Sequence, residues 1–271
     1  MPPDPTIDEL LAPIVAAPAR AAVLLDVDGT LAPIVRMAND AHVPQTTRAP
    51  LARVAKEYGL TACVSGRQAT VARRLVSLGT VSYIGNHGAE LLRAGTTTVE
   101  PAPEAERHRA QVQRFARAAL AGADVPRARL RGEDKGAIYA FHWRGAPDEA
   151  GAERVARQLA ADAEGEGLAV HWGRKVLEVR PPVAITKGTG VRALLGRSPA
   201  IRTALYAGDD RTDVDAFDAL RQLRDEGALD QVVCLGVASA ETPEELRAGA
   251  DALVSGPEGV REILERLVTA L

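Results

Sequence analysis

The chain has 271 residues, of which 46% are apolar and 25% are charged, and its formal net charge is −3. This composition is typical of a globular chain that forms one large domain or two smaller ones. The slightly acidic balance and the aromatic content of 3% argue against a nucleic-acid partner, since such partners favour basic patches and aromatic stacking. No block of Lys or Arg points to a membrane surface.

The first twenty residues carry acids where an export signal needs basic residues, and proline interrupts their short apolar run. No stretch of the chain is long enough and apolar enough to span a bilayer. Cys63 and Cys234 each lie inside an apolar run, which indicates buried, reduced thiols. We therefore expect a cytoplasmic protein.

Five short apolar runs predict strands that are buried on both faces: residues 21–25, 60–64, 81–84, 203–207 and 232–237. Helical patterns lie between several of them, at residues 47–59, 68–79 and 213–227. Strands that alternate with helices predict a parallel sheet covered by helices on both faces.

The pattern changes between about residues 103 and 182. A helical stretch followed by two strands around a Gly-containing turn occurs twice there, with strand-like alternation in "AIYAFHW" and "VLEVR". We therefore predict an α/β fold with a doubly wound, Rossmann-like parallel core at residues 1–102 and 183–271. A smaller α+β cap domain is inserted at residues 103–182.

Four of the five predicted core strands are followed by a polar residue: Asp26, Ser65, Asn86 and Asp209. Ligands of open parallel sheets bind at the carboxyl ends of the strands, so these residues predict one site.

The chemistry of this site is suggested by its residue types. Asp26, Asp28 and Asp209 are hard oxygen ligands suited to Mg²⁺. Ser65 and Lys187 are groups that a phosphoryl group needs around its oxygens. Simpler interpretations remain open at this point: the paired acids could form a solvated turn, and Ser65 could cap a helix.

The motifs "DVDGTL", "VSGR", "TKG" and "GDDRTD" occur in this order along the predicted core. Together they resemble the four motifs of the haloacid dehalogenase superfamily of phosphatases. The resemblance implies that Asp26 is the nucleophile, which forms an aspartyl-phosphate, and that Asp28 is the general acid and base. Ser65 and Lys187 would hold the phosphate, and Asp209 would bind Mg²⁺ with Asp26 and Asp28.

By the same resemblance, Asp210 and Asp213 would orient Lys187 and the waters of the metal, although both could simply cap a helix. After "TD" the family usually carries Glu, and this chain has Val214.

The segments "GNHGAE", "EDKGAIYAFHWR" and "GRKVLEVRP" resemble the trehalose-6-phosphate phosphatases within that superfamily. The resemblance implies an Mg²⁺-dependent phosphatase whose small-molecule substrate is the sugar phosphate trehalose 6-phosphate, which it hydrolyses to trehalose and phosphate. The candidate substrate-binding residues are Arg67, Asn86 and His87 in the core, and Glu133, Lys135, Arg144, Lys175 and Glu178 in the insertion. The charges of the insertion could instead form a solvated hairpin face.

Other functions remain compatible with these motifs. The nearest is a phosphatase for another sugar phosphate, such as sucrose phosphate or a glycosyl-phosphoglycerate. A non-catalytic sugar-phosphate sensor is disfavoured, because both Asp26 and Asp28 are present. The sequence does not decide the oligomeric state and is compatible with a monomer.

Overall fold

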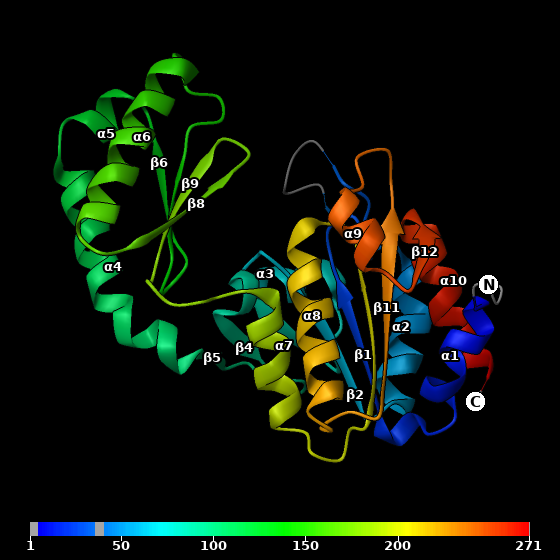
Figure 1. The fold of residues 1–271 in the computed structure, drawn as a ribbon. Coiled ribbons are helices and arrows are strands. Elements are labelled where there is room, and N and C mark those ends of the chain that lie inside the picture. Colours follow the sequence, from blue (N-terminus) through cyan, green and yellow to red (C-terminus); the bar gives the residue numbers. More distant parts are fainter. Residues whose placement is uncertain (1–4, 36–40, 271) are drawn as a thin grey trace. The chain divides into compact units, whose positions relative to one another are not determined.

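The computed structural model describes residues 5–35 and 41–270. The chain divides into two compact units (Figure 1). We call residues 1–100 with 185–271 the core unit, and residues 101–184 the inserted unit. Within the described residues, no helix combines the length and apolarity needed to cross a membrane.

The core unit contains an eight-stranded sheet with the order β12-β11-β10-β1-β2-β3-β4-β5. All five predicted strands are present and pair in parallel: β1 Ala21–Asp26, β2 Leu60–Val64, β3 Ser82–Gly85, β10 Thr203–Gly208 and β11 Gln231–Ala238. Three further strands were not predicted: β4 Glu90–Leu92, β5 Val99–Pro101 and β12 Ala252–Ser255. Strand β4 pairs antiparallel to β3, and β12 pairs parallel to β11.

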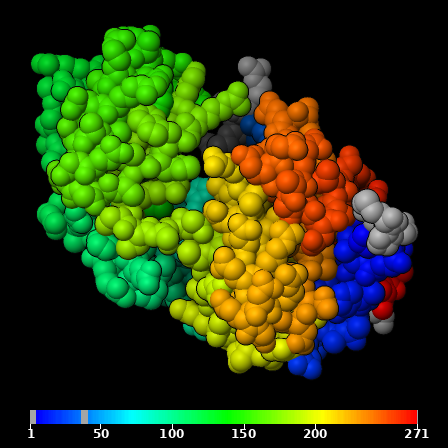
Figure 2. Space-filling model, in the orientation of Figure 1, coloured from blue at the N-terminus to red at the C-terminus, as the bar shows by residue number. Residues whose placement is uncertain are grey.

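Helices cover both faces of this sheet, which confirms the predicted α/β class (Figure 1). One face packs against α1 Ile7–Val15, α2 Gln45–Glu57, α3 Ala69–Val76 and α10 Gly256–Thr269. The other packs against α7 Lys187–Gly196, α8 Arg211–Asp225 and α9 Glu244–Gly249. In the space-filling view, α8 forms part of the outer surface on this second side (Figure 2).

The alternation of side chains along β1 determines where its last residue points. Ala21, Val23 and Leu25 join the core on the α1–α2 side, whereas Ala22 and Leu24 join the core on the α7–α8 side. Successive side chains of a strand point to opposite faces, so Asp26 continues the second series. Its carboxylate is therefore directed to the α7–α8 side of the sheet.

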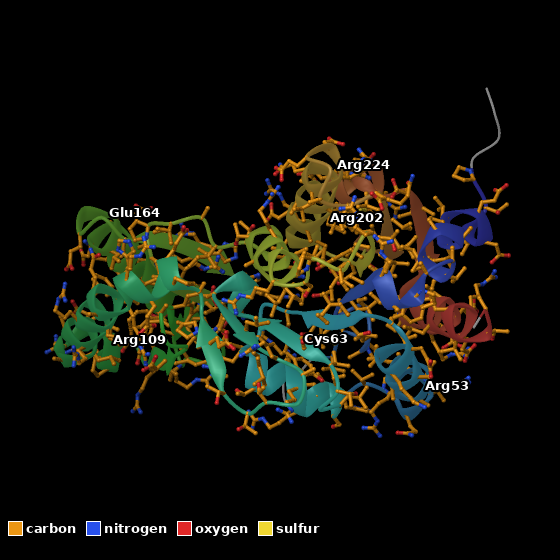
Figure 3. All side chains as sticks on the ribbon, turned by 90° about the horizontal axis from the view of Figure 1, so that it is seen from below. Arg53, Cys63, Arg109, Glu164, Arg202 and Arg224 are labelled. Atoms are coloured by element: carbon orange, nitrogen blue, oxygen red, sulfur yellow. The ribbon has the colours of Figure 1, made fainter. Side chains whose placement is uncertain are left out.

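Both cysteines are free thiols inside the core unit, as predicted. Cys63 lies on β2 among the packed side chains (Figure 3). Burial raises the pKa of Cys234 to about 12, which keeps this thiol protonated and unreactive at neutral pH.

The inserted unit is a four-stranded antiparallel sheet with the order β6-β7-β9-β8. Its strands are β6 Arg131–Asp134, β7 Tyr139–His142, β8 Ala169–Gly173 and β9 Val176–Arg180. Helices α4 Pro103–Ala121, α5 Asp124–Arg127 and α6 Glu149–Gly165 supply residues to one apolar core with Tyr139, Phe141, Leu177 and Val179. The side chains that alternate with these along the strands are mostly polar and lie on the opposite face of the sheet.

Candidate active site

A buried lysine joins the end of β1 to the start of α8. The Nζ of Lys187 donates to Asp26 Oδ1 at 2.6 Å and to Asp213 Oδ1 at 2.7 Å. All three side chains are at most 5% exposed. Burial alone would lower the pKa of Lys187, but the charges of Asp213 and Asp26 outweigh it and raise that pKa. The ammonium therefore stays charged next to the Asp26 carboxylate.

The position of Lys187 in its helix is itself informative. It is the first residue of α7, and Thr186 caps this helix in a reciprocal capping box with Thr189. A cation at a helix N-terminus opposes the helix dipole, so Lys187 is placed there against the local electrostatic preference. Asp26 and Asp213 offset that cost, which suggests a role for Lys187 in function.

The two acids at the start of α8 have different partners. Asp210 is the N-cap, and its side chain accepts from the Arg211 backbone N–H at 2.6 Å. Asp213 accepts from the Asp210 backbone N–H at 3.0 Å through Oδ2, and from Lys187 through Oδ1. Asp210 is thus a capping residue, whereas Asp213 both caps the helix and holds Lys187.

Three carboxylates converge at the carboxyl end of β1. Asp26, Asp209 and Asp213 each offer an oxygen within 4.8 Å of the others, a spacing that could hold a metal ion. Burial raises the pKa of Asp26, and the nearby charges of Asp213 and Asp209 add to this effect. Burial and the charge of Asp213 likewise raise the pKa of Asp209, to about 6. A cation among these oxygens would relieve their mutual repulsion.

The turn after β1 brings the backbone close to Asp209. Gly29 has a φ of +90°, and a Cβ at this position would lie 2.0 Å from Asp209 Oδ2. The Thr30 hydroxyl donates to Asp209 Oδ1 at 3.3 Å. Gly29 is therefore required both by its backbone conformation and by this close approach.

Asp28, which we expected to bind the metal through its side chain, lies outside the acid cluster. Its carboxylate receives two hydrogen bonds of 2.7 Å from the guanidinium of Arg67. Arg67, expected to bind substrate, thus contacts the expected general acid. The Oγ of buried Ser65 accepts from the Arg67 backbone N–H at 3.1 Å, and helix α3 is preceded by Gln68, so Ser65 is not its N-cap.

The "GNHG" segment is hydrogen-bonded to the loop that carries Ser65 and Arg67. Asn86 and His87 have φ values of 48° and 56°, in the left-handed region that few residues other than glycine adopt. Their backbone N–H groups donate to the carbonyls of Arg67 at 2.7 Å and Ser65 at 3.0 Å. The His87 ring packs closely over Gly66. Both residues therefore lie beside the "VSGR" motif of the core unit.

Three of the five expected residues of the inserted unit come together on the polar face of its sheet. Ala140 pairs with Glu133 on one side and with Glu178 on the other, so both acids point to the same face. Lys135 donates to Glu178 at 2.8 Å, and Arg180 donates to the same carboxylate at 3.0 Å. Burial alone would raise the pKa of Glu178, but Lys135 and Arg180 outweigh it and lower this pKa to about 2.

The other two expected residues have different surroundings. Lys175, with a φ of 61°, donates to Glu149 at 2.5 Å. Arg144 donates to the Arg174 carbonyl at 3.4 Å. Both contacts lie at the turn between β8 and β9 and are not part of the Glu178 cluster.

Two residues of these clusters, Arg180 and His142, were not predicted from the sequence. Arg180 pairs with Glu178, and His142 lies 2.8 Å from Glu133. The alternation in "VLEVR" places Glu178 and Arg180 on one face and could have indicated the first pair. Val214, which stands where the family usually has Glu, lies on α8 and packs against the apolar core on the α7–α8 side of the sheet.

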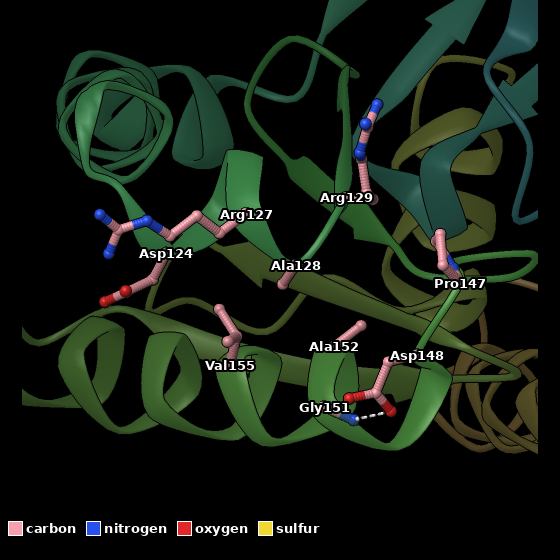
Figure 4. Close-up of a pocket in the computed structure, with 9 residues that line it drawn as sticks. All are labelled: Asp124, Arg127, Ala128, Arg129, Pro147, Asp148, Gly151, Ala152 and Val155. Atoms are coloured by element: carbon pink, nitrogen blue, oxygen red, sulfur yellow. Dashed lines mark hydrogen bonds between the residues drawn. The ribbon is translucent and has the colours of Figure 1, made fainter.

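The inserted unit also has a pocket of about 350 Å³ beside the start of α6 (Figure 4). Arg127 and Arg129 line it, but their guanidinium groups extend away from its floor of Ala128 and Ala152. The Asp148 carboxylate accepts a hydrogen bond from the Gly151 backbone N–H at 2.8 Å. None of the expected catalytic residues lines this pocket, so it is not the active site.

Comparisons with known proteins identify the family of this chain. The family model described as trehalose-phosphatase matches residues 24–249. A probable trehalose-phosphate phosphatase of Sinorhizobium fredii is 34% identical over 204 residues, which cover 74% of each chain. A Mycobacterium tuberculosis protein described as an uncharacterized glycosyl hydrolase is also 34% identical, but the match covers only 15% of its length.

The fold has a solved counterpart. The C-terminal domain of the C. albicans trehalose-6-phosphate phosphatase superposes with a TM-score of 0.71 at 21% identity, and 98% of each chain is covered. A match at this level of identity supports the fold alone. The family model spans most of the chain and includes Asp26, Ser65, Lys187 and Asp209. This chain therefore belongs to the trehalose-phosphatase family.

Proposed function

We propose that this chain hydrolyses trehalose 6-phosphate to trehalose and inorganic phosphate, with Asp26 as the nucleophile. The observation that carries the proposal is the buried pairing of Asp26 with Lys187 at the carboxyl end of β1. Lys187 lowers the pKa of Asp26 and so opposes the net rise that burial and the charges of Asp213 and Asp209 cause, which favours the ionised carboxylate that a nucleophile needs. Family membership supports trehalose 6-phosphate as the substrate.

Mg²⁺ is the cofactor that fits the carboxylate cluster best. The Oδ2 of Asp26 is buried and accepts no hydrogen bond from the described residues, so it is available as a ligand. Asp209 would be the second protein ligand, because the contacts of Asp213 with Lys187 and the α8 backbone already use both of its oxygens. When bound, the ion would neutralise charge that develops on the transferring phosphoryl group.

The proposed reaction has two steps. In the first, an oxygen of Asp26 forms a bond to phosphorus while the bond from phosphorus to the sugar oxygen breaks, and protonated Asp28 gives its proton to that oxygen. In the second, Asp28 takes a proton from water as the water oxygen bonds to phosphorus, and the bond from phosphorus to Asp26 breaks. Lys187 and Ser65 would hold the phosphoryl oxygens throughout.

Asp28 must change its partner to perform these steps. In the structure the guanidinium of Arg67 donates to both oxygens of the Asp28 carboxylate, so these oxygens are not directed at a leaving group. We infer that Asp28 leaves Arg67 for the leaving oxygen of the substrate. Arg67 would then contact the phosphate.

We further propose that the inserted unit recognises the sugar. Glu133, Lys135 and Glu178 present carboxylate and ammonium groups on one face, and such groups can satisfy several hydroxyl donors and acceptors at once. Arg144 and Lys175 would contribute from the neighbouring turn.

The buried free thiols of the core unit support the cytoplasm as the compartment.

A panel of phosphate esters tests the proposal. We expect the purified chain to release phosphate from trehalose 6-phosphate faster than from sucrose 6-phosphate, glucose 6-phosphate or a glycosyl-phosphoglycerate. The release should require Mg²⁺ and stop in excess chelator. Faster hydrolysis of one of the other sugar phosphates would assign the chain to that substrate, and full activity in chelator would contradict the metal role.

A further inference from the structure

A buried tyrosine, Tyr206, is connected to Lys187 through Asp213, which accepts hydrogen bonds from both. Tyr206 is on β10, its side chain is fully buried, and it pairs in register with Leu24 of β1. Both residues belong to the apolar core on the α7–α8 side of the sheet. The Tyr206 ring packs edge-on against Phe217 of α8, with ring centroids 5.8 Å apart. The ring is thus fixed by packing that does not involve its hydroxyl group.

The hydroxyl group of Tyr206 donates to Asp213 Oδ1 at 2.6 Å. This is the same oxygen that receives the ammonium of Lys187, which in turn contacts Asp26. The other oxygen of Asp213 accepts from the α8 backbone. A buried run of hydrogen bonds therefore leads from Tyr206 through Asp213 and Lys187 to the nucleophile.

Each of these contacts restrains the next one. The backbone contact anchors one oxygen of Asp213 but leaves rotation about the axis through that oxygen. The Tyr206 hydroxyl restricts this rotation, because it holds the second oxygen of Asp213 together with Lys187. The side chain of Lys187 is flexible and its ammonium group has three donors, so its position depends on where Asp213 Oδ1 lies.

We propose that Tyr206 is a positioning residue, which holds Asp213 so that Lys187 points at Asp26 and at the transferring phosphoryl group. The inference rests on the proposed phosphatase function and adds a residue to its machinery. It predicts that removal of one hydroxyl group, with the ring left in place, slows phosphoryl transfer from any ester. A purely structural role for Tyr206 predicts lost stability and unchanged catalysis.

Tyr83 provides a matched control. It is fully buried in the same sheet, on β3, and its hydroxyl donates to the Leu78 carbonyl, also at 2.6 Å. It belongs to the apolar core on the opposite face and contacts none of the catalytic residues named above. Tyr83→Phe and Tyr206→Phe therefore delete the same group, with the same hydrogen-bond length, from two fully buried side chains.

The experiment measures kcat and KM of the parent and both variants on trehalose 6-phosphate and on p-nitrophenyl phosphate. We expect Tyr206→Phe to lower kcat about tenfold on both esters, which corresponds to about 1.4 kcal/mol, with KM nearly unchanged. Tyr83→Phe should retain the parent kcat. Inhibition by orthovanadate, which mimics the phosphoryl group in transfer, should weaken about as much as kcat falls in Tyr206→Phe alone.

An unchanged kcat in Tyr206→Phe, or an equal loss in both variants, would overturn the inference. A parent that hydrolyses p-nitrophenyl phosphate but not trehalose 6-phosphate would contradict the proposed substrate, and the comparison of the two variants on p-nitrophenyl phosphate would still decide the role of Tyr206. A parent inactive on both esters would contradict the proposed function and the inference together.

Discussion

Replacement of Glu178 with Gln is expected to destabilise the inserted unit in a way that depends on pH. The Glu178 carboxylate is buried between Lys135 and Arg180, whose side chains are each only 12% exposed. The pKa of Glu178 falls from 4.5 to about 2 in the folded chain. At about 1.4 kcal/mol for each tenfold change in proton affinity, this difference corresponds to roughly 3 kcal/mol of stabilisation by the ionised carboxylate.

The direction of the pH effect follows from the lowered pKa. The folded state favours the ionised carboxylate, so its stabilising contribution is complete above about pH 4.5 and is lost as the pH falls toward 2. At pH 6 the parent should exceed Glu178→Gln by roughly 3 kcal/mol in free energy of unfolding, and at pH 3 by only about 1 kcal/mol. Other carboxylates also titrate over this range, but they are common to both proteins and cancel in the difference.

Urea denaturation followed by tryptophan fluorescence measures this difference. The chain has two tryptophans, Trp143 and Trp172, and both lie in the inserted unit, so their signal reports that unit specifically. Hydrolysis of p-nitrophenyl phosphate controls for an intact core unit. A difference between parent and variant that stays constant from pH 6 to pH 3 would refute the assignment of a buried, ionised Glu178.

Three further predictions concern catalysis and recognition. Gly29→Ala should abolish phosphate release, because its Cβ would lie 2.0 Å from Asp209 Oδ2; retained activity would contradict the close approach of the two motifs. Asp209→Ala should raise the Mg²⁺ concentration needed for half-maximal rate or eliminate activity, and a Mg²⁺ titration that matches the parent's would exclude Asp209 as a ligand. Lys175→Asn, which tolerates the left-handed backbone there, should lower kcat/KM for trehalose 6-phosphate by roughly 10- to 100-fold, as expected for a lost charged hydrogen bond of about 1.5–3 kcal/mol. It should spare p-nitrophenyl phosphate, and equal losses on both esters would point to a structural role.

The sequence predicts the framework of the core unit well, because its signals are local. Apolar runs mark the five central strands, and the polar residue after each of four strands marks the edge where a site forms. The short edge strands β5 and β12 cannot be recognised in this way, since three or four residues carry too little pattern.

Contacts between distant side chains were the least predictable part of the site. Arg67 and Asp28 are 39 residues apart, and no local pattern indicates that they meet. The alternation in "VLEVR" correctly separates Leu177 from Glu178, yet it suggests that Glu178 is solvated. The carboxylate is buried because long side chains from a neighbouring turn and from its own strand cover it.

The identity of the nucleophile is the central claim, and one measurement tests it most directly: phosphate and trehalose release from trehalose 6-phosphate by the parent and by Asp26→Asn at saturating Mg²⁺. The amide keeps the shape of the side chain but cannot attack phosphorus. Uncatalysed hydrolysis cannot mask the loss, because phosphate monoesters require accelerations of up to about 10²¹-fold. We predict equal amounts of trehalose and phosphate from the parent and neither from the variant. Substantial release by a folded Asp26→Asn variant would contradict the account.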